Sequence, residues 1–514
     1  MSATDNESKT ARRIPRWAKI LFFCIFNPLV ALAIAAAAIL PPWINAYKDT
    51  LGAEPVYTNV FVAALGDKQE RLASIEEPKL AVVGGSSVAF GLDSELLGRY
   101  TDMEVVNFGL YATLGSKIML DLSEGEMKAG DVVVFAPELD STTLSMYFGA
   151  DAMWQAIDAT PSLRELVRPE DRGTLYGDAF DRYRENKAEL LEMGAPNPSG
   201  VYNRKNFNEY GDISYKRPYN TMAAGYDTNT LFNLSESLLD DEAMELISYF
   251  NGYCERLSAK GVKVYFSFCP INELAMADGI SPESISALEE RLRAELACPV
   301  ISSLEDYVMD WGYFFDTNLH LNDAGVKVRT AMLIDDIRAA LGMTAAPRLT
   351  LPDPPGKEIG NELLDGDNRY MDYFTYENVT LPDGTVVGVK IVGVTDEALE
   401  NTDSHVVIPH SNGEYLVVEV GRGVLSRIPN LKEISFGRKI ASIEDGVFEG
   451  CESLTDVYFE FSPDECGVSI PDADNPLGLM TGAKEGITLH ATEEYHQTFV
   501  GHYTWSHYAK YFKK

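Results

Sequence analysis

The chain has 514 residues, enough for two to four domains, and 46% of them are hydrophobic, as in ordinary globular proteins. Its formal net charge of −35 argues against nucleic acid as a partner, because phosphate binding needs clustered Lys and Arg. The six cysteines form no close pairs and no zinc-type spacing, so they predict neither a disulfide framework nor a zinc site, and no cofactor is expected.

The N-terminal region has the pattern of a membrane anchor. Residues 1–19 are polar and contain five basic side chains, and Ile20 to Leu40 follows without a charged residue. Roughly 20 apolar residues span a bilayer as a helix, and preceding basic residues favour a cytoplasmic N-terminus. We therefore expect a cytoplasmic tail (1–19), a single-pass anchor (20–41) in the cell membrane and an extracellular bulk. A cleaved signal peptide is the alternative, because the alanine-rich end at 35–38 resembles a signal-peptidase region.

Residues 42–78 are expected to form a helical stalk, and an alternating α/β pattern begins at residue 79. Short apolar segments alternating with longer amphipathic ones predict a three-layer α/β sandwich around a parallel sheet of about five strands. The domain is expected to span 79–342. Strands are expected at 80–83, 104–107, 131–135, 262–268 and 300–302, and helices at 93–100, 116–128, 241–260, 282–297 and 323–341.

An insertion at 141–236 interrupts this alternation between the third and fourth strands. Insertions of this length are often lids or binding loops. Its aromatic side chains could stack on sugar rings, or they could form the small core of a helical cap, and the sequence leaves both interpretations open. They are Tyr202, Phe207, Tyr210, Tyr215, Tyr219 and Tyr226.

A candidate nucleophile follows the first strand. The apolar run 80–83 stops at Gly84-Gly85-Ser86-Ser87 and a helix follows, which places a serine at the carboxyl end of the strand, where parallel sheets bind ligands. A serine nucleophile needs a base, usually a histidine held by a carboxylate. His320 is the one histidine before residue 400, and Asp316 precedes it by four residues. The sequence therefore predicts a triad of Ser87, His320 and Asp316.

These residues give the chain a resemblance to SGNH (GDSL-type) hydrolases. The run Gly85 to Gly91 resembles the G-x-S-x-x-x-G nucleophile block, with Ser87 at the nucleophile position. Asp316 and His320 are matched to the D-x-x-H block, and Asn107-Phe108-Gly109 to the block that carries an oxyanion-hole glycine. The resemblance implies an SGNH- or flavodoxin-like sandwich and an esterase or acyltransferase activity, and it extends distantly to D-alanyl-transfer proteins of teichoic acid synthesis.

The third block of this family departs from the pattern. The family places an Asn here, as a side-chain donor to the oxyanion, whereas this chain has Glu138. A carboxylate accepts hydrogen bonds and would repel an oxyanion. The resemblance leaves the backbone N–H groups of Ser87 and Gly109 as the oxyanion hole. Asn272, which follows the fourth strand, could supply the missing donor or could serve as a loop or cap residue.

A linker (343–369) rich in Pro, Gly and Asp leads to a second domain, 370–514, which contains a repeat. Val420 to Leu425 recurs as Ile443 to Phe448, 23 residues later (443 − 420 = 23). The segment Gly446 to Leu454 resembles BspA-type leucine-rich repeats of bacterial surface proteins. That resemblance implies a short solenoid that binds a protein or glycan ligand.

Two features flank the repeats. Residues 405–409 are expected to form the first strand of the solenoid. Four histidines near the C-terminus could bind a metal or could belong to a packed cap; they are His490, His496, His502 and His507.

Two functions remain open on this sequence. The first is a membrane-anchored, extracytoplasmic serine esterase or acyltransferase that acts on an acylated glycan or polysaccharide of the cell envelope. The second is a catalytically inactive SGNH-like surface protein whose repeats mediate binding or adhesion. Ser87, Asp316 and His320 favour the first function, and Glu138 favours the second.

Overall fold

A computed structural model describes residue 45 and residues 47–198, 200–222, 224–355, 368–381, 384, 386–437, 440–463, 466–471, 475–492, 495–502 and 504–513. The chain divides into two compact units, 1–54 and 55–514, and the second carries all the elements discussed below. The expected anchor at 20–41 lies outside the described residues. Within the described part of the chain, no helix has the length and apolar character needed to cross a membrane.

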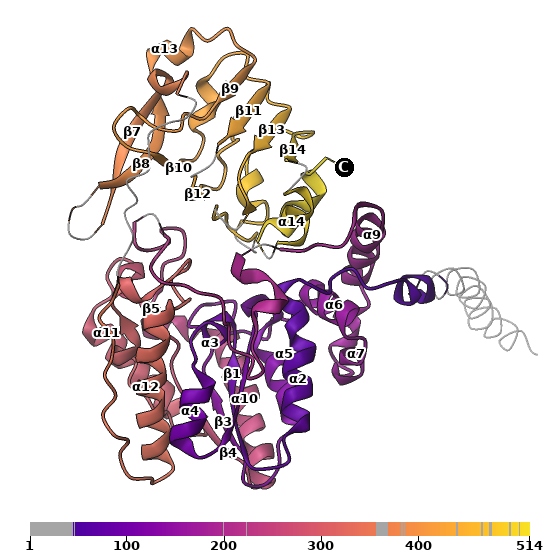
Figure 1. Ribbon diagram of the computed structural model, residues 1–514, viewed down its shortest axis with the longest axis vertical. Coiled ribbons are helices and arrows are strands. Elements are labelled where there is room, and N and C mark those ends of the chain that lie inside the picture. The colour runs from indigo at the N-terminus through magenta and orange to yellow at the C-terminus, as the bar shows by residue number, and fades with distance from the viewer. Residues whose placement is uncertain are drawn as a thin grey trace, which may run out of the picture. The chain divides into compact units, whose positions relative to one another are not determined.

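The centre of the α/β part is a parallel sheet, and the prediction of a mixed α/β protein is confirmed (Figure 1). Four strands lie in the order β2-β1-β3-β4. They are β1 (Lys79–Gly84), β2 (Glu104–Gly109), β3 (Val132–Phe135) and β4 (Lys263–Phe266), and all pair in parallel. The expected strand at 300–302 is reduced to an isolated bridge between Phe266 and Val300.

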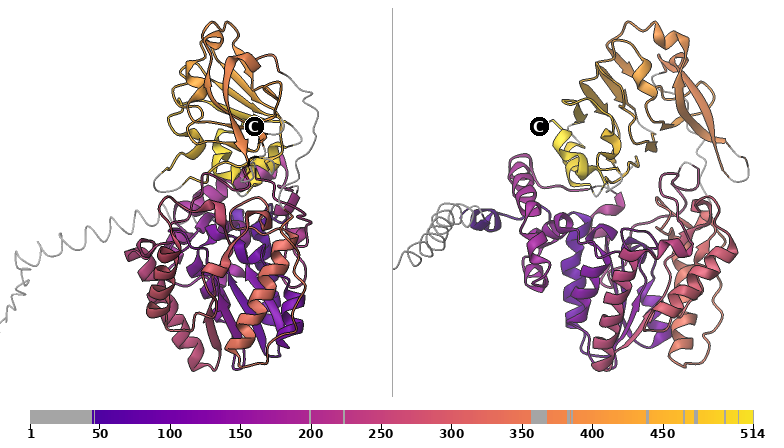
Figure 2. Two further views of the ribbon diagram at one scale, coloured as in Figure 1. Left: turned by 90° about the vertical axis from the view of Figure 1, so that its left-hand side faces the viewer. Right: turned by 180° about the vertical axis from the view of Figure 1, so that it is seen from behind.

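Helices cover both faces of this sheet (Figure 2). Side chains alternate along β1, so Leu80 and Val82 pack on one face with Leu97 and Ile337 from the two helices on that side. Phe135 points to the other face, where its ring lies 4.7 Å from that of Phe250. The first face is covered by α4 (Ser94–Thr101) and α12 (Asp323–Ala340), and the second by α2 (Ala64–Ser74), α5 (Ser116–Glu124) and α10 (Asp241–Ala259). A further helix, α11 (Pro282–Glu295), follows β4 in the chain.

The N-terminal boundary of the sheet unit differs from the expected stalk at 42–78. Residues 55–78 belong to the unit, because α2 packs against β2 and buries Leu65 and Leu72 completely. A preceding 3₁₀ turn, Phe61–Ala63, is also buried. The apolar side of this helix covers the sheet. The sequence predicted a stalk that only leads to the sheet, whereas residues 55–78 form part of its core.

The first half of the insertion forms a helical cap. It contains α6 (Ala150–Ala159), α7 (Leu163–Leu166), α8 (Arg172–Leu175) and α9 (Asp178–Met193). Trp154 of α6 is fully buried and stacks on Tyr183 of α9, with ring centroids 5.0 Å apart. Its indole N–H donates to the carbonyl oxygen of Leu175. Aromatic residues in this half therefore build a core of their own.

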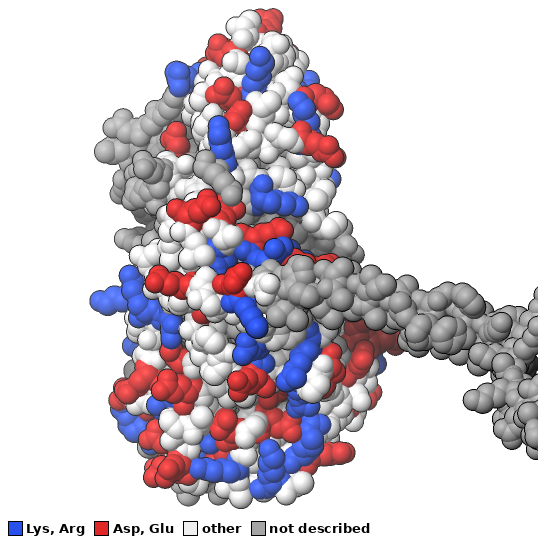
Figure 3. Space-filling view, turned by 90° about the vertical axis from the view of Figure 1, so that its right-hand side faces the viewer, with Lys and Arg blue, Asp and Glu red and all other residues white. Residues whose placement is uncertain are grey.

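The charged side chains on one face of the molecule are interspersed (Figure 3). Figure 3 shows basic and acidic residues intermixed on the face it draws, without a large area of one sign. Exposed ion pairs contribute to this pattern, such as Arg182 with Asp151 and Arg204 with Asp67. Pairs of this kind typically contribute about 0–1 kcal/mol each, so they distribute the charge more than they stabilise the fold.

The C-terminal part contains two four-stranded sheets. One has the order β12-β10-β8-β7 and the other β14-β13-β11-β9, and every pairing is parallel except the hairpin of β7 and β8. The strands are β7 (Phe374–Thr380), β8 (Val386–Val394), β9 (His405–Val407), β10 (Val417–Val420), β11 (Glu433–Phe436), β12 (Ser442–Ile443), β13 (Asp456–Phe459) and β14 (Thr488–Ala491). Short helices α13 (Asp396–Leu399) and α14 (His496–Gly501) complete this part.

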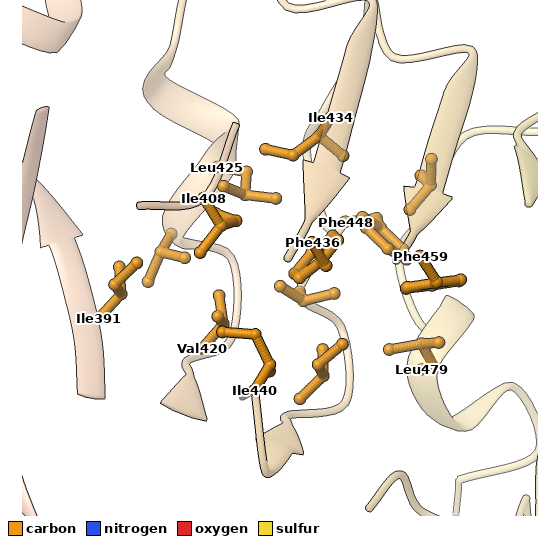
Figure 4. Packing of buried hydrophobic residues seen from close by; sticks show 14 of the residues in the cluster. Ile391, Ile408, Val420, Leu425, Ile434, Phe436, Ile440, Phe448, Phe459 and Leu479 are labelled. Atoms are coloured by element: carbon orange, nitrogen blue, oxygen red, sulfur yellow. The ribbon is translucent and has the colours of Figure 1, made fainter. Parts of the chain in front are cut away.

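The pairing register reproduces the sequence repeat. Val420 of β10 lies opposite Ile443 of β12, and Ile434 of β11 lies opposite Val457 of β13, so equivalent positions 23 residues apart become neighbours. Apolar side chains from both sheets pack into one cluster (Figure 4). Each copy of the repeat thus contributes a strand to each sheet and buries its apolar residues against the next copy.

Candidate active site

The Ser87 turn is held by contacts from three elements. β1 ends at Gly84, and the short helix α3 (Ser86–Ala89) starts directly afterwards. The backbone N–H of Ser87 donates to Oε1 of Glu138, 2.8 Å away, and its carbonyl oxygen accepts from Arg329 of α12 at 2.6 Å. A Cβ atom at Gly85 would collide with the Glu138 carboxyl, so the glycine allows that carboxyl to lie directly against the turn. Ser87 itself is 0% exposed.

The end of β2 supports this turn from the neighbouring strand. A Cβ atom at Gly109 would collide with Val88, so the glycine allows the turn to pack directly on the strand. The Asn107 side chain donates to the carbonyl oxygen of Val88 at 3.0 Å and accepts from the N–H of Gly109 at 3.1 Å. The Asn-Phe-Gly block therefore lies beside the serine turn, as the sheet order β2-β1 requires.

Asp316 and His320 form a hydrogen-bonded pair. Oδ1 of Asp316 lies 2.8 Å from Nδ1 of His320, and Oδ2 accepts a hydrogen bond from the hydroxyl of Tyr202 at 2.6 Å. An ionised carboxylate is an acceptor, so this contact assigns the proton of the neutral imidazole to Nδ1 and leaves Nε2 as the basic nitrogen. His320 is only 4% exposed, which limits how far the ring can reorient.

The turn that carries this pair is fixed by its backbone. The two residues are four positions apart, one more than in a D-x-x-H block, and a bridge between Phe314 and Leu321 closes the loop around them. The N–H groups of Leu319 and His320 donate to the Thr317 hydroxyl. These contacts bring the side chains of Asp316 and His320 together in spite of the longer spacing.

Phe90 connects the serine turn to the histidine. Its ring follows α3 and stacks on the imidazole of His320, with centroids 3.8 Å apart and planes inclined by 5°. The Arg217 guanidinium lies over the Phe90 ring at 5.2 Å from its centroid. The structure thus brings the Ser87 turn and the Asp316–His320 pair to one edge of the sheet. Among the described residues, Ser87 Oγ is buried without a hydrogen-bond partner, so the bond from Ser87 to His320 is not made in this conformation.

The three expected oxyanion donors all have acceptors within the protein. The Ser87 N–H bonds to Glu138, and the Gly109 N–H bonds to Asn107. The Asn272 amide donates to the carbonyl oxygen of Gly225 at 2.9 Å, while its oxygen caps a 3₁₀ turn by accepting from Leu274. The loop-and-cap interpretation of Asn272 matches these bonds. An oxyanion role for any of the three stays a prediction, and it requires these internal bonds to change.

Tyr202 and Arg217 are site residues whose roles the sequence did not reveal. Both come from the second half of the insertion, and Tyr202 lies 114 positions before Asp316 in the chain. The only available signal was the abundance of aromatic residues in that loop. The insertion also bonds to the histidine loop elsewhere: the Asn318 amide donates to the carbonyl oxygens of Asp227 and Thr230. This part of the insertion therefore belongs to the site.

Among the described residues, no group of three or more His, Cys, Asp or Glu side chains converges in a way that could hold a metal ion. His490 Nε2 instead donates a hydrogen bond to Oδ1 of Asp456 at 2.7 Å, and its ring stacks on Tyr458. His502 is buried, and its ring nitrogen Nδ1 accepts from the backbone of Thr504. Both histidines thus form hydrogen bonds with residues of the C-terminal part.

Comparisons with models of protein families and with curated proteins find no match for this chain. The chemistry of the site has therefore to be derived from its geometry. A buried serine hydroxyl stands at the carboxyl end of β1, and a basic imidazole nitrogen fixed by Asp316 lies at the same edge. This combination of groups is suited to nucleophilic attack on an acyl carbon.

Proposed function

We propose that the α/β part is a serine-dependent acyl-transfer enzyme of the SGNH type, an ester hydrolase or an O-acyltransferase. The observation that carries the proposal is the Asp316–His320 pair beside the Ser87 turn, linked to it by the stacking of Phe90 on His320. Asp316 fixes the imidazole tautomer, and its charge would stabilise the imidazolium that forms during catalysis.

The reaction proceeds in two half-reactions. Ser87 Oγ attacks the carbonyl carbon of an ester while His320 Nε2 accepts the hydroxyl proton. The tetrahedral intermediate then expels the alcohol, which takes that proton from the imidazolium, and an acyl-serine remains. In the second half-reaction His320 deprotonates water or an acceptor hydroxyl. The oxygen of that water or acceptor then attacks the acyl-serine carbonyl carbon. The acyl group is released from Ser87, and the imidazolium of His320 returns the proton to Ser87 Oγ.

The substrate class in this proposal is an acylated glycan or polysaccharide of the cell envelope. Support comes from the resemblance to SGNH proteins and from the apolar segment at 20–41, which would place the bulk of a single-pass protein outside the cell. The C-terminal part would act as a short leucine-rich-repeat solenoid that holds a glycan or protein ligand. Its paired 23-residue repeats support that interpretation.

A non-catalytic surface protein is the second candidate. The observation that favours it is Glu138, which stands where the resembled family has an Asn and accepts the hydrogen bond of the Ser87 N–H. If Glu138 is ionised, its charge would oppose an oxyanion at this place. The α/β part would then be a scaffold, and binding by the repeats would be the function.

The test compares Ser87→Ala with Ser86→Ala in the full-length protein. The assays are hydrolysis of aryl esters, release of acyl groups from O-acetylated glycans, and covalent labelling by a fluorophosphonate. We expect Ser87→Ala to lose labelling and to reduce turnover by at least on the order of 10³-fold, because the nucleophile is removed. Ser86→Ala removes a neighbouring hydroxyl and should retain both the labelling and the turnover of the wild type. Equal inertness of the wild type and Ser87→Ala toward all three reagents would favour the non-catalytic function.

A further inference from the structure

Glu138 is a buried carboxyl group that lacks the partners a buried charge requires. It is 1% exposed. Oε1 accepts from the Ser87 N–H at 2.8 Å, whereas Oε2 is buried without a hydrogen-bond partner among the described residues. No ion pair to Glu138 occurs in the described part of the chain. An uncompensated buried carboxylate is costly, and such groups usually take up a proton instead.

The surroundings of Glu138 also favour its protonated form. Burial raises the pKa of the Glu138 carboxyl, and the nearby negative charge of Asp140 raises it further. The Ser87 N–H acts in the opposite direction, as does the Ser87 hydroxyl, which lies nearby without meeting hydrogen-bond geometry. The Arg329 guanidinium, which feels the charge of Glu138, is directed to the carbonyl oxygen of Ser87. The Cys269 thiol also lies close enough to feel the charge of Glu138.

We propose that Glu138 works as a neutral carboxylic acid whose Oε2–H donates a hydrogen bond to the oxyanion formed at Ser87. The position is the one where the resembled family carries its Asn donor, and the inference rests on the proposed acyl-transfer function. In this state the two carboxyl oxygens have different roles, because Oε1 accepts from the Ser87 N–H while Oε2 presents a donor. A buried carboxylic acid kept neutral for donation is an established way to stabilise an oxyanion.

This assignment removes the conflict between Glu138 and catalysis. The acid donates without giving up its proton, so the proton balance of the two half-reactions is unchanged. The hydrogen bond from the Ser87 N–H to Oε1 polarises the carboxyl group and thereby strengthens Oε2–H as a donor. Ionisation of Glu138 would replace this donor with a negative charge, so activity should fall as the pH rises through the pKa of Glu138.

The charge state can be tested without a substrate. The experiment measures thermal unfolding from pH 5 to pH 9 for the wild type, Glu138→Gln and the control Glu126→Gln. A carboxyl whose pKa is higher in the folded state than in the unfolded state stabilises the fold below its unfolded value, near 4.5, and this contribution disappears as the pH rises through the folded value. The wild type should therefore lose stability relative to Glu138→Gln as the pH rises, and Glu126→Gln should run parallel to the wild type. Parallel curves for Glu138→Gln would overturn a neutral Glu138.

The donor role is tested by the rate of Ser87 labelling with a fluorophosphonate and by aryl-ester hydrolysis over the same pH range. Glu138→Gln keeps a donor of the same shape that cannot ionise, so it should match the wild type within a few-fold at low pH and should lack its decline at high pH. Glu138→Leu removes the donor, so it should be slower than Glu138→Gln by about 10²–10³-fold at every pH.

The outcomes separate this inference from the function on which it rests. A Glu138→Leu variant as active as the wild type, while Ser87→Ala is inactive, would overturn the donor role and leave the serine enzyme standing. In that case Glu138 would be an acceptor that occupies the oxyanion position. If Ser87→Ala and the wild type behave alike, the proposed acyl-transfer function fails and the donor role fails with it.

Discussion

Two buried charged residues, Lys68 and Asp212, form hydrogen bonds that join the insertion to the sheet near the serine turn. Lys68 of α2 donates to the carbonyl oxygens of Asn107 on β2 and Gly211 in the insertion. Asp212, the next residue, accepts from the Asn107 amide at 2.9 Å and from the hydroxyl of Ser94 at 2.7 Å. Asn107 is thus bonded to both charged residues, and the same side chain supports the turn at Val88. Single polar side chains here link the insertion, the sheet and the site.

Lys68 provides a test of these contacts. Burial lowers the pKa of its ammonium group from 10.5 to about 7, with Asp212 opposing the shift. Between pH 7 and pH 10.5 the unfolded state binds more protons than the folded state. The contribution of Lys68 to the free energy of unfolding therefore rises with pH across that window. In thermal unfolding, the wild type should gain stability relative to Lys68→Met from pH 7 to pH 10. The exposed control Lys216→Met should show no such trend, and parallel curves for Lys68→Met would contradict the lowered pKa.

At the scale of elements, α12 is positioned by its N-terminal cap. Asn322 accepts from the N–H groups of Ala324 and Gly325, and its amide donates to the carbonyl oxygens of Gly312 and Phe314. One fully buried side chain therefore fixes both the start of the helix and the loop that precedes the histidine. Because α12 also carries Arg329, which donates to the carbonyl oxygen of Ser87, the cap connects the histidine loop to the serine turn.

Asn322→Ala should therefore cost more than the loss of an ordinary cap. The missing cap costs about 0.5–2 kcal/mol, and the carbonyl groups left unsatisfied add about 1–3 kcal/mol. The control is Asp240→Ala at the start of α10, where the side chain accepts from Ala243 and, within the described part of the chain, has no hydrogen bond to a preceding loop. Urea unfolding should show a loss at least about 1 kcal/mol larger for Asn322→Ala. Equal losses would show that the loop bonds contribute little.

These elements also show what the sequence could predict. Helix starts at Asp240, Ser281 and Asn322 carry capping side chains, and the expected helices begin close to them. The strand expected at 300–302 is reduced to a bridge, because an apolar run indicates burial but not a pairing partner. Likewise, the contact of Asp316 with Tyr202 joins residues far apart in the chain, and local patterns carry no information on such contacts. The Asp316–His320 pair was predictable because both residues lie in one turn.

At the scale of the whole molecule, the C-terminal part is built on a fixed period. Val420 pairs with Ile443 and Ile434 pairs with Val457, so both sheets advance by 23 residues per copy. Side chains alternate between the two faces of a strand, and a shift of one residue moves every apolar side chain to the wrong face. The period of the sequence therefore determines which residues are buried in the cluster of Figure 4.

The period can be tested by deletion. Removing residues 424–446 takes out one full period and joins Gly423 to Val447, the counterpart of Val424 in the next copy. This variant should keep one cooperative thermal transition for the C-terminal part, at a lower midpoint because one copy is lost. The control deletion 424–445 is one residue shorter and shifts the register, so it should lose that transition. Similar circular dichroism and melting of the two variants would contradict the register.

The complete burial of Ser87 sets an order of events for any chemistry at this residue. An acyl group cannot touch a hydroxyl with 0% exposure, so neighbouring side chains have to move before the covalent step begins. Turnover is then bounded by the frequency of that opening, however reactive the ester is. Ligands that stabilise the opened site would therefore react faster than ligands that do not. Discrimination between ligands would thus take place when the site opens, before any bond is made or broken.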